Sequence, residues 1–211
     1  VELGEGFAWR MPPSYDCSLF FLTNPNAPTG LLFPKSTVKP FAAAFDGVVL
    51  IDEAYADFSS VASLLARVPG KANLVVLQTL SKAWGLAGIR LGMAFAHPRV
   101  ISLLTAVKYP YNVNALTMAH AMEALDQPQR MEGQRNQILA ERVLLARNLE
   151  QRSCIEEVHP SDANFLLVRT TDARGIYDFM IERGIILRDR SGAALCSGCL
   201  RITVGTPEEN Q

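Results

Sequence analysis

The 211-residue sequence lacks a surplus of charge of either sign, since 20 lysines and arginines stand against 21 aspartates and glutamates. A nucleic-acid-binding domain usually carries a basic stripe, and this sequence has none. It has no apolar run near the roughly 18 residues that a membrane-spanning helix needs. Its first residues also lack the basic start and apolar stretch of a signal peptide. Hydrophobic residues still make up 49% of the chain, so we expect a folded cytoplasmic enzyme that binds neither nucleic acid nor membrane.

Histidine and cysteine are scarce, with three and four residues respectively. Cys196 and Cys199 have the spacing C-x-x-C, but a zinc site would need a second close pair, and Cys17 and Cys154 lie far apart. A redox pair usually opens a helix after a strand, whereas this one precedes an apolar run typical of a strand. We therefore predict buried or half-buried free thiols in a reducing compartment, and no metal site.

Short apolar runs alternate with polar, glycine- or proline-bearing segments in the first half of the chain. Runs of this length, apolar on both faces, are typical of strands buried between helix layers. The intervening segments, such as residues 35–45, are long enough for helical crossovers. The pattern predicts an α/β fold, with a mostly parallel sheet and helices on both faces. The expected strands are 19–22, 48–51, 74–77 and 91–96.

The second half changes character and predicts a smaller α+β domain. Helical spacing of apolar residues predicts a long helix from about residue 129 to 151. We place the domain boundary near residue 150, so that 1–150 form the large domain with an interdomain helix and 151–211 the small one. The other elements expected here are helices 115–125 and 173–183 and strands 164–168, 185–187 and 200–204.

Chemically capable side chains directly follow the predicted strands. Open α/β sheets bind ligands outside the carboxyl ends of their strands, so we expect these residues to converge on one crevice. A lysine there, such as Lys82, can form a Schiff base with a carbonyl compound. The Arg90 guanidinium suits a phosphate, and the Asp52 carboxylate can hold a cationic ring nitrogen, as it would in pyridoxal 5'-phosphate (PLP).

Four motifs in order carry a resemblance to a known family. They are Asn24-Pro25-Asn26-Ala27-Pro28-Thr29-Gly30, Asp52-Glu53-Ala54-Tyr55, Thr79-Leu80-Ser81-Lys82 followed by Arg90, and Leu200-Arg201-Ile202-Thr203-Val204-Gly205. The series resembles the class I/II aminotransferases of PLP fold type I, and within them it is most similar to the histidinol-phosphate aminotransferases. The likeness runs from about residue 17 to residue 207.

The resemblance implies PLP as cofactor and a role for each matching residue. Lys82 would bind the cofactor aldehyde and transfer a proton, Asp52 would pair with the pyridine nitrogen, and Tyr55 would donate a hydrogen bond to the phenolic oxygen. The implied holders of the cofactor phosphate are Thr79, Ser81 and Arg90. The implied binder of the substrate's anionic group is Arg201, Arg188 is a candidate for a second phosphate contact, and Asn164 is a further candidate for substrate binding.

The resemblance also implies partners: a small-molecule amino donor (histidinol phosphate), a 2-oxo acid (2-oxoglutarate) and a second copy of the chain in a homodimer. The Arg201 guanidinium could bind the carboxylate of glutamate or the phosphate ester of histidinol phosphate at the same place. Tyr109 and Tyr111 either line the neighbouring subunit's active site or are aromatic residues of a proline-flanked turn.

Some features depart from the family pattern. Ala27 stands where the family usually has an asparagine, so we expect this loop to contribute less to cofactor affinity. The family also has segments before Leu19 and after Pro207 that do not appear here, and we expect residues 1–211 alone to bind PLP weakly and to have little activity. A threonine-phosphate decarboxylase, the effector domain of a transcription regulator and a purely structural segment remain alternatives.

Overall fold

The computed structural model describes residues 3–9 and 16–211, which fall into two compact units. The larger unit comprises residues 16–25 and 33–135, and the smaller unit comprises 3–9, 26–32 and 136–211. The chain passes from one unit to the other within the long helix α4 (Pro128–Glu150). The domain boundary near residue 150 stays a prediction.

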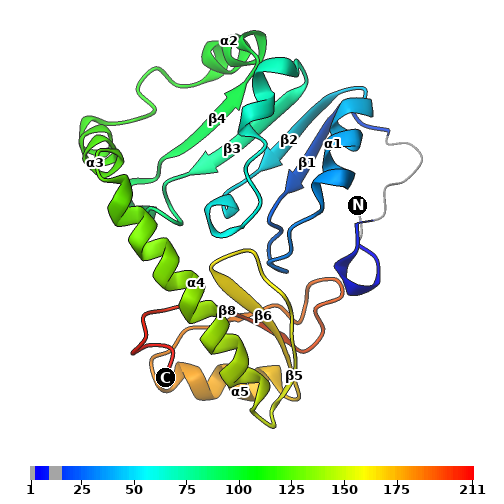
Figure 1. Cartoon of the computed structure of the whole chain (residues 1–211), viewed down its shortest axis with the longest axis vertical. Helices are drawn as coiled ribbons and strands as arrows, with labels where there is room; N and C mark the ends of the chain where they lie inside the picture. The colour runs from blue at the N-terminus through cyan, green and yellow to red at the C-terminus, as the bar shows by residue number, and fades with distance from the viewer. Residues whose placement is uncertain (1–2, 10–15) are drawn as a thin grey trace. The chain divides into compact units, whose positions relative to one another are not determined.

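The larger unit contains a four-stranded sheet with the order β1-β2-β3-β4 (Figure 1). Its strands are β1 (Leu19–Thr23), β2 (Val48–Asp52), β3 (Leu74–Thr79) and β4 (Gly92–Ala96). The first three run parallel and β4 is antiparallel to β3. Val49, Ile51 and Val76 are fully buried, as expected for β-branched residues in central strands. The prediction of an α/β fold with a mostly parallel sheet is confirmed.

Helix α1 (Lys35–Ala44) forms the crossover from β1 to β2. Phe41 and the following Phe45 pack on Phe20 of β1, with ring centroids 4.7 and 5.9 Å away, and such aromatic contacts bury much apolar area. Two further helices, α2 (Pro98–Val107) and α3 (Ala115–Leu125), are capped by His97 and Asn114. Short 3-10 helices occupy Ala56–Phe58, Leu65–Gly70 and Ala87–Ile89.

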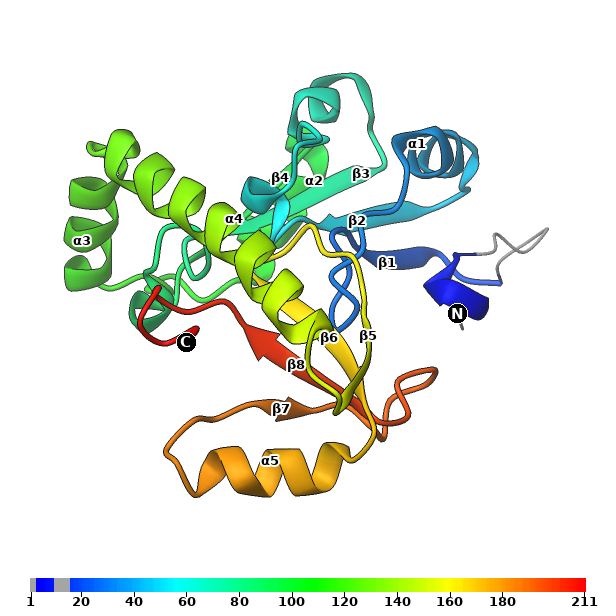
Figure 2. The ribbon, with the colours of Figure 1, turned by 60° about the horizontal axis from the view of Figure 1, so that its bottom comes forward.

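The smaller unit contains an antiparallel sheet with the order β5-β6-β8-β7 (Figure 2). Its elements are β5 (Ile155–Val158), β6 (Phe165–Thr170), α5 (Ala173–Ile181), β7 (Arg188–Asp189) and β8 (Cys199–Thr203). On one face of β6, Leu166 and Val168 pack with Leu145 of α4. On the other, Leu167 packs with Phe7 from the 3-10 turn Glu5–Phe7. Because both faces are covered, this central strand is almost entirely buried.

The predicted strand at 185–187 is wrong. Helix α5 ends in a turn through Gly184, in which the Ile185 N–H donates to the Met180 carbonyl at 3.0 Å. This turn keeps the following residues away from β8, so pairing begins only with Arg188 opposite Arg201. The prediction also missed α2 and β5, although the other expected strands and helices are present.

All four cysteines are free thiols, with Cys196 and Cys199 buried and Cys17 and Cys154 exposed. Burial raises the pKa of both Cys196 and Cys199, which disfavours their reactive thiolate forms. Among residues 3–9 and 16–211 no three metal-ligating side chains gather at one place. Within those residues, none of the helices combines the length and the hydrophobicity that crossing a bilayer requires.

Candidate functional site

The carboxyl ends of β1, β2 and β3 lie next to one another at one edge of the larger unit's sheet. Thr23 is the register partner of Asp52, and Asp52 is the partner of Leu77, two residues before Thr79. The Asn24 N–H donates to the Asp52 carbonyl at 2.8 Å and continues the ladder past the end of β1. Parallel pairing therefore brings the polar ends of β2 and β3 together, as the sequence predicts.

Asp52 is half-buried and its carboxylate orientation is fixed by the chain that follows it. Its Oδ1 accepts a hydrogen bond from the Ala54 N–H at 3.0 Å. The next residue, Tyr55, lies in a turn and faces the segment after β3, since the Lys82 Nζ is 5.2 Å from the centre of the Tyr55 ring. An amine and a phenol from two different strand ends are thus neighbours, within the range of a cation–π contact.

The Lys82 segment is held by buried neighbours and by hydrogen bonds. Leu80 and Ala83, on either side of Ser81 and Lys82, are buried. The Thr79 hydroxyl donates to the Leu91 carbonyl at 3.1 Å and accepts from the Ser81 N–H at 3.1 Å. In this arrangement Thr79 shapes the turn that presents Ser81 and Lys82, and a hydrogen bond from its hydroxyl to a phosphate would require the hydroxyl to rotate.

Arg90 follows the 3-10 helix Ala87–Ile89 in the left-handed conformation, with φ of 57°. Its Nη1 donates to the Ala87 carbonyl at 2.9 Å, and the side chain is exposed. A guanidinium has five N–H donors, so the group keeps donors for an anion while this bond fixes its direction.

The three predicted substrate-binding residues belong to the smaller unit. Arg188 of β7 is the register partner of Arg201 of β8, and the Arg201 guanidinium carbon lies 4.9 Å from the centre of the Phe165 ring. Like charges directly opposite each other on neighbouring strands repel, so this pair favours an anion that both can contact. Asn164 precedes β6, and its carbonyl accepts from the Val204 N–H at 2.9 Å.

The sequence pattern of the family "Aminotransferase class I and II" matches residues 10–211. The chain belongs to the class I and II aminotransferase family. A histidinol-phosphate aminotransferase of Parabacteroides distasonis is 49% identical to this member of the family over 192 residues, which are 91% of the chain and 56% of that relative. The chain thus spans little more than half the length of the curated relatives that it matches.

Solved structures of the aminotransferase fold are also similar. A histidinol-phosphate aminotransferase from Sinorhizobium meliloti in complex with PLP is 26% identical and has a TM-score of 0.82. The match covers 92% of this chain and 55% of the Sinorhizobium chain. An L-threonine-O-3-phosphate decarboxylase from Porphyromonas gingivalis is 28% identical with a TM-score of 0.82, covering 92% and 61%. The fold of this chain is therefore shared by enzymes of two reaction types.

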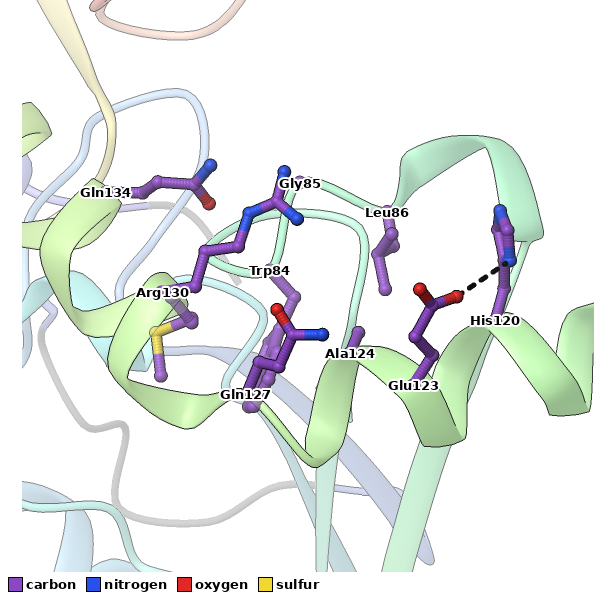
Figure 3. A pocket seen from close by; sticks show the side chains of 10 residues that line it. Trp84, Gly85, Leu86, His120, Glu123, Ala124, Gln127, Arg130 and Gln134 are labelled. Atoms are coloured by element: carbon purple, nitrogen blue, oxygen red, sulfur yellow. Dashed lines mark ion pairs between the residues drawn. The ribbon is translucent and has the colours of Figure 1, made fainter.

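A pocket of about 340 Å³ opens beside the loop that follows Lys82 (Figure 3). The loop faces helices α3 and α4, and the His120 Nδ1 lies 3.7 Å from the Glu123 Oε2 at its rim. None of the residues predicted to bind PLP lines this pocket, which is distinct from the strand-end site. Its lining residues are Trp84, Gly85, Leu86, His120, Glu123, Ala124, Gln127, Arg130, Met131 and Gln134.

The sequence prediction assigned no role to Glu53, which the fold buries directly beside Asp52. A carboxylate is rarely buried unless it is paired or hydrogen-bonded. The sequence signal for Glu53 is its position, since it is a second acidic residue directly after a buried strand. Successive side chains of a strand point to opposite faces of the sheet, so Glu53 and Asp52 face different environments.

Proposed function

We propose that the full-length protein containing this chain is a PLP-dependent aminotransferase that exchanges an amino group between histidinol phosphate and 2-oxoglutarate. The observation that carries the proposal is the pairing of two strand ends, one with Asp52 and Tyr55, the other with Lys82, whose Nζ is 5.2 Å from the Tyr55 ring. The choice of substrates is supported by the 49% identity to a histidinol-phosphate aminotransferase.

The side chains at these strand ends fit PLP by their chemistry. The group has an aldehyde, a phenolic oxygen, a ring nitrogen and a phosphate, and the chain offers an amine, a phenol, a carboxylate and a cluster of hydroxyl and guanidinium donors. Lys82, Tyr55 and Asp52 would hold the first three parts. Thr79, Ser81 and Arg90 would hold the phosphate. When bound, PLP supplies an electron-withdrawing ring that stabilises negative charge at the substrate's α-carbon.

The chain's own residues orient that chemistry and move protons. The Asp52 carboxylate keeps a proton on the ring nitrogen, because an adjacent negative charge favours the cationic form. The Lys82 Nζ removes the α-proton of the substrate and returns a proton to the product, as a positioned general base and acid. The Tyr55 hydroxyl donates to the phenolic oxygen. Arg201 would bind the acidic group of either substrate, Arg188 would be a second contact for the phosphate, and Asn164 is a further candidate for substrate binding.

The same similarity supports a homodimer that acts in the cytoplasm as part of histidine biosynthesis. Tyr109 and Tyr111, which the family resemblance associates with the subunit interface, are 84% and 94% exposed in this chain. Large exposed aromatic residues often mark a protein–protein contact.

The test of the cofactor assignment is borohydride reduction of the full-length protein with PLP, followed by peptide mapping. We expect the pyridoxyl group on the peptide that contains Lys82, and none in Lys82→Arg. We also expect Lys82→Ala to lower turnover by at least about a hundredfold, the range attributed to general acid–base catalysis. Labelling at another lysine, or no labelling, would overturn the assignment.

Decarboxylation is the second candidate, because the threonine-phosphate decarboxylase of Porphyromonas gingivalis is as similar in fold as the aminotransferases. The two functions separate in a single-turnover experiment. Histidinol phosphate should convert the bound cofactor to its amino form, and 2-oxoglutarate should restore the original absorbance. Release of CO₂ from threonine phosphate without this cycle would favour the decarboxylase.

A further inference from the structure

Glu53 is a buried carboxylate, only 5% exposed, that directly follows Asp52 at the end of β2. Its Oε1 accepts from the Leu64 N–H at 2.7 Å. Its Oε2 accepts from the Gln78 Nε2 at 3.2 Å and from the Ser63 hydroxyl. The Ser63 Oγ itself accepts from the Leu65 N–H at 2.9 Å, so its own hydrogen is left for Glu53. Both carboxylate oxygens therefore face donors.

The backbone of Glu53 fixes the turn that contains Tyr55. The Glu53 N–H donates to the Leu77 carbonyl at 2.9 Å, which extends the β2–β3 ladder by one residue. The Glu53 carbonyl accepts from the Ala56 N–H at 3.0 Å and closes a turn around Ala54 and Tyr55. The start of the Tyr55 turn is thus tied to the strand that leads to Lys82.

The side chain of Glu53 holds the other end of the same loop. Its hydrogen bonds with Ser63 and Leu64 hold the chain that follows the 3-10 helix Ala56–Phe58. Its hydrogen bond with Gln78 connects this loop to β3. Phe58 and Leu64, at 1% and 4% exposure, pack the loop from within. One residue therefore anchors both ends of residues 54–64, and the position of Tyr55 relative to Lys82 depends on it.

We propose that Glu53 is a positioning residue of the strand-end site, whose buried carboxylate holds Tyr55 at the correct distance from Lys82 and from the cofactor's phenolic oxygen. The inference rests on the proposed function. Its physical basis is that a hydrogen bond weakens steeply when its geometry changes, and that a displacement near 1 Å in an active site can cost about a hundredfold in rate.

The first test replaces Glu53 by glutamine in the full-length holoenzyme. Glutamine keeps the size of the side chain but replaces one of the two carboxylate oxygens by an NH₂ group. Because an NH₂ group cannot accept a hydrogen bond, at least one of the donors that face Glu53 loses its acceptor. We expect the Kd for PLP to rise about tenfold, equivalent to roughly 1.4 kcal/mol. We also expect a shift in the pH at which the bound cofactor's absorbance changes. Glu123→Gln, which alters an exposed carboxylate of the same unit, should change neither quantity.

A double-mutant cycle with Tyr55→Phe separates positioning from simple stabilisation. If Glu53 acts through Tyr55, Glu53→Gln should change the Kd for PLP by less than about twofold in the Tyr55→Phe background. The pH at which the bound cofactor's absorbance changes should then also stay the same. Additive effects would overturn the inference, as would a Glu53→Gln protein that melts earlier but binds PLP normally. Should Glu53→Gln fail to fold, Ser63→Ala removes one of the three donors to Glu53. The double-mutant cycle of Ser63→Ala with Tyr55→Phe then tests the inference by the same criterion.

The outcome also distinguishes this inference from the proposed function. Absence of the borohydride-trapped adduct at Lys82 in the unmodified protein contradicts the proposed function itself. An adduct that forms equally well and with equal affinity in Glu53→Gln contradicts the role of Glu53 alone.

Discussion

Gly30 adopts the left-handed conformation, with φ of 77°, where the chain lies against Ser161. A Cβ atom at this position would lie 2.5 Å from the Ser161 Oγ and 2.9 Å from its Cβ. Ser161 cannot easily yield, because its hydroxyl donates to the Phe165 carbonyl at 2.6 Å and accepts from the Ala163 N–H at 3.0 Å. The Asp162 N–H also donates to the Gly30 carbonyl at 2.7 Å. Only glycine satisfies both the backbone and the packing.

Gly30→Ala should therefore destabilise the protein by about 2 kcal/mol or more, combining left-handed strain with overpacking. The measurement is the midpoint of urea unfolding. The matched control is Gly133→Ala in α4, where the added methyl group meets nothing within 4 Å, and this change should stabilise the helix by up to about 1 kcal/mol. An unchanged midpoint for Gly30→Ala would contradict the argument.

His159 lies buried in the smaller unit, with its ring centroid 5.2 Å from that of Phe7 in an edge-to-face arrangement and its Nδ1 3.1 Å from the Glu157 Oε1. Burial lowers the pKa of His159, although Glu157 opposes the effect, and Arg169 adds to it. A folded-state pKa below the unfolded value means that the unfolded chain binds the proton more readily. The stability that the neutral ring contributes is therefore complete above about pH 6.5 and is lost as the pH falls toward the folded-state pKa.

We expect the unfolding midpoint of the protein to fall between about pH 7.5 and pH 5 more steeply than that of His159→Gln. Glutamine can still donate to Glu157 but does not titrate, so the difference between the two curves isolates the histidine. Parallel curves for the two proteins would mean that His159 is not a source of acid sensitivity.

Helix α5 illustrates how an element boundary is set by one side chain. Asp172 is its N-cap, and its Oδ1 accepts from the Gly175 N–H at 2.9 Å. The carboxylate satisfies an N–H that has no partner within the helix and complements the positive end of the helix dipole.

Asp172→Ala should lower the free energy of unfolding by roughly 1 kcal/mol, whereas Asp172→Asn, which keeps the oxygen, should cost only a few tenths. Hydrogen exchange at the Gly175 amide should rise with the alanine and change little with the asparagine. Equal exchange in both variants would show that the cap is not the source of stability.

At the scale of elements, apolar runs in the sequence predicted β1, β2, β3 and β8. Only one face of β1 is buried in this chain, since Phe20 and Leu22 are buried whereas Leu19 and Phe21 are exposed. The missed elements lack that signature. β5 reads Ile155-Glu156-Glu157-Val158, with two acidic residues at its centre, and few of its residues face a core. α2 carried a usable signal, since Pro98 at its first turn follows the capping His97. β7 consists of two residues, and only tertiary pairing defines it.

The candidate site was predictable to a similar extent. The positions of Asp52 and Lys82 at strand ends follow from the parallel order of β2 and β3, which the sequence pattern indicates. The network around Glu53 was not predictable, because it joins residues 53, 63 and 78 through hydrogen bonds that no periodicity encodes. The roles of the site residues remain predictions for the experiments above.

At the scale of the whole molecule, the larger unit presents large apolar side chains to solvent along α2 and α3. Val107 and Leu116 are 82% and 84% exposed, and Tyr109 and Tyr111 lie between them. A folded protein rarely leaves so many large apolar residues uncovered, and such surfaces usually meet another chain. The proposed homodimer would cover these residues with a second copy.

Leu116→Glu in the full-length protein should therefore shift the mass measured by sedimentation from dimer toward monomer, because a buried unpaired charge at an interface costs several kcal/mol. Gln129→Glu adds the same charge at an exposed polar position of α4 and should leave the dimer intact. If these side chains are instead covered by other segments of the same chain, Leu116→Glu will reduce the yield of folded protein while the remaining folded material keeps its mass. A dimer that keeps both its mass and its yield would exclude Leu116 from any interface, and would leave Tyr109 and Tyr111 as residues of a solvent-exposed turn.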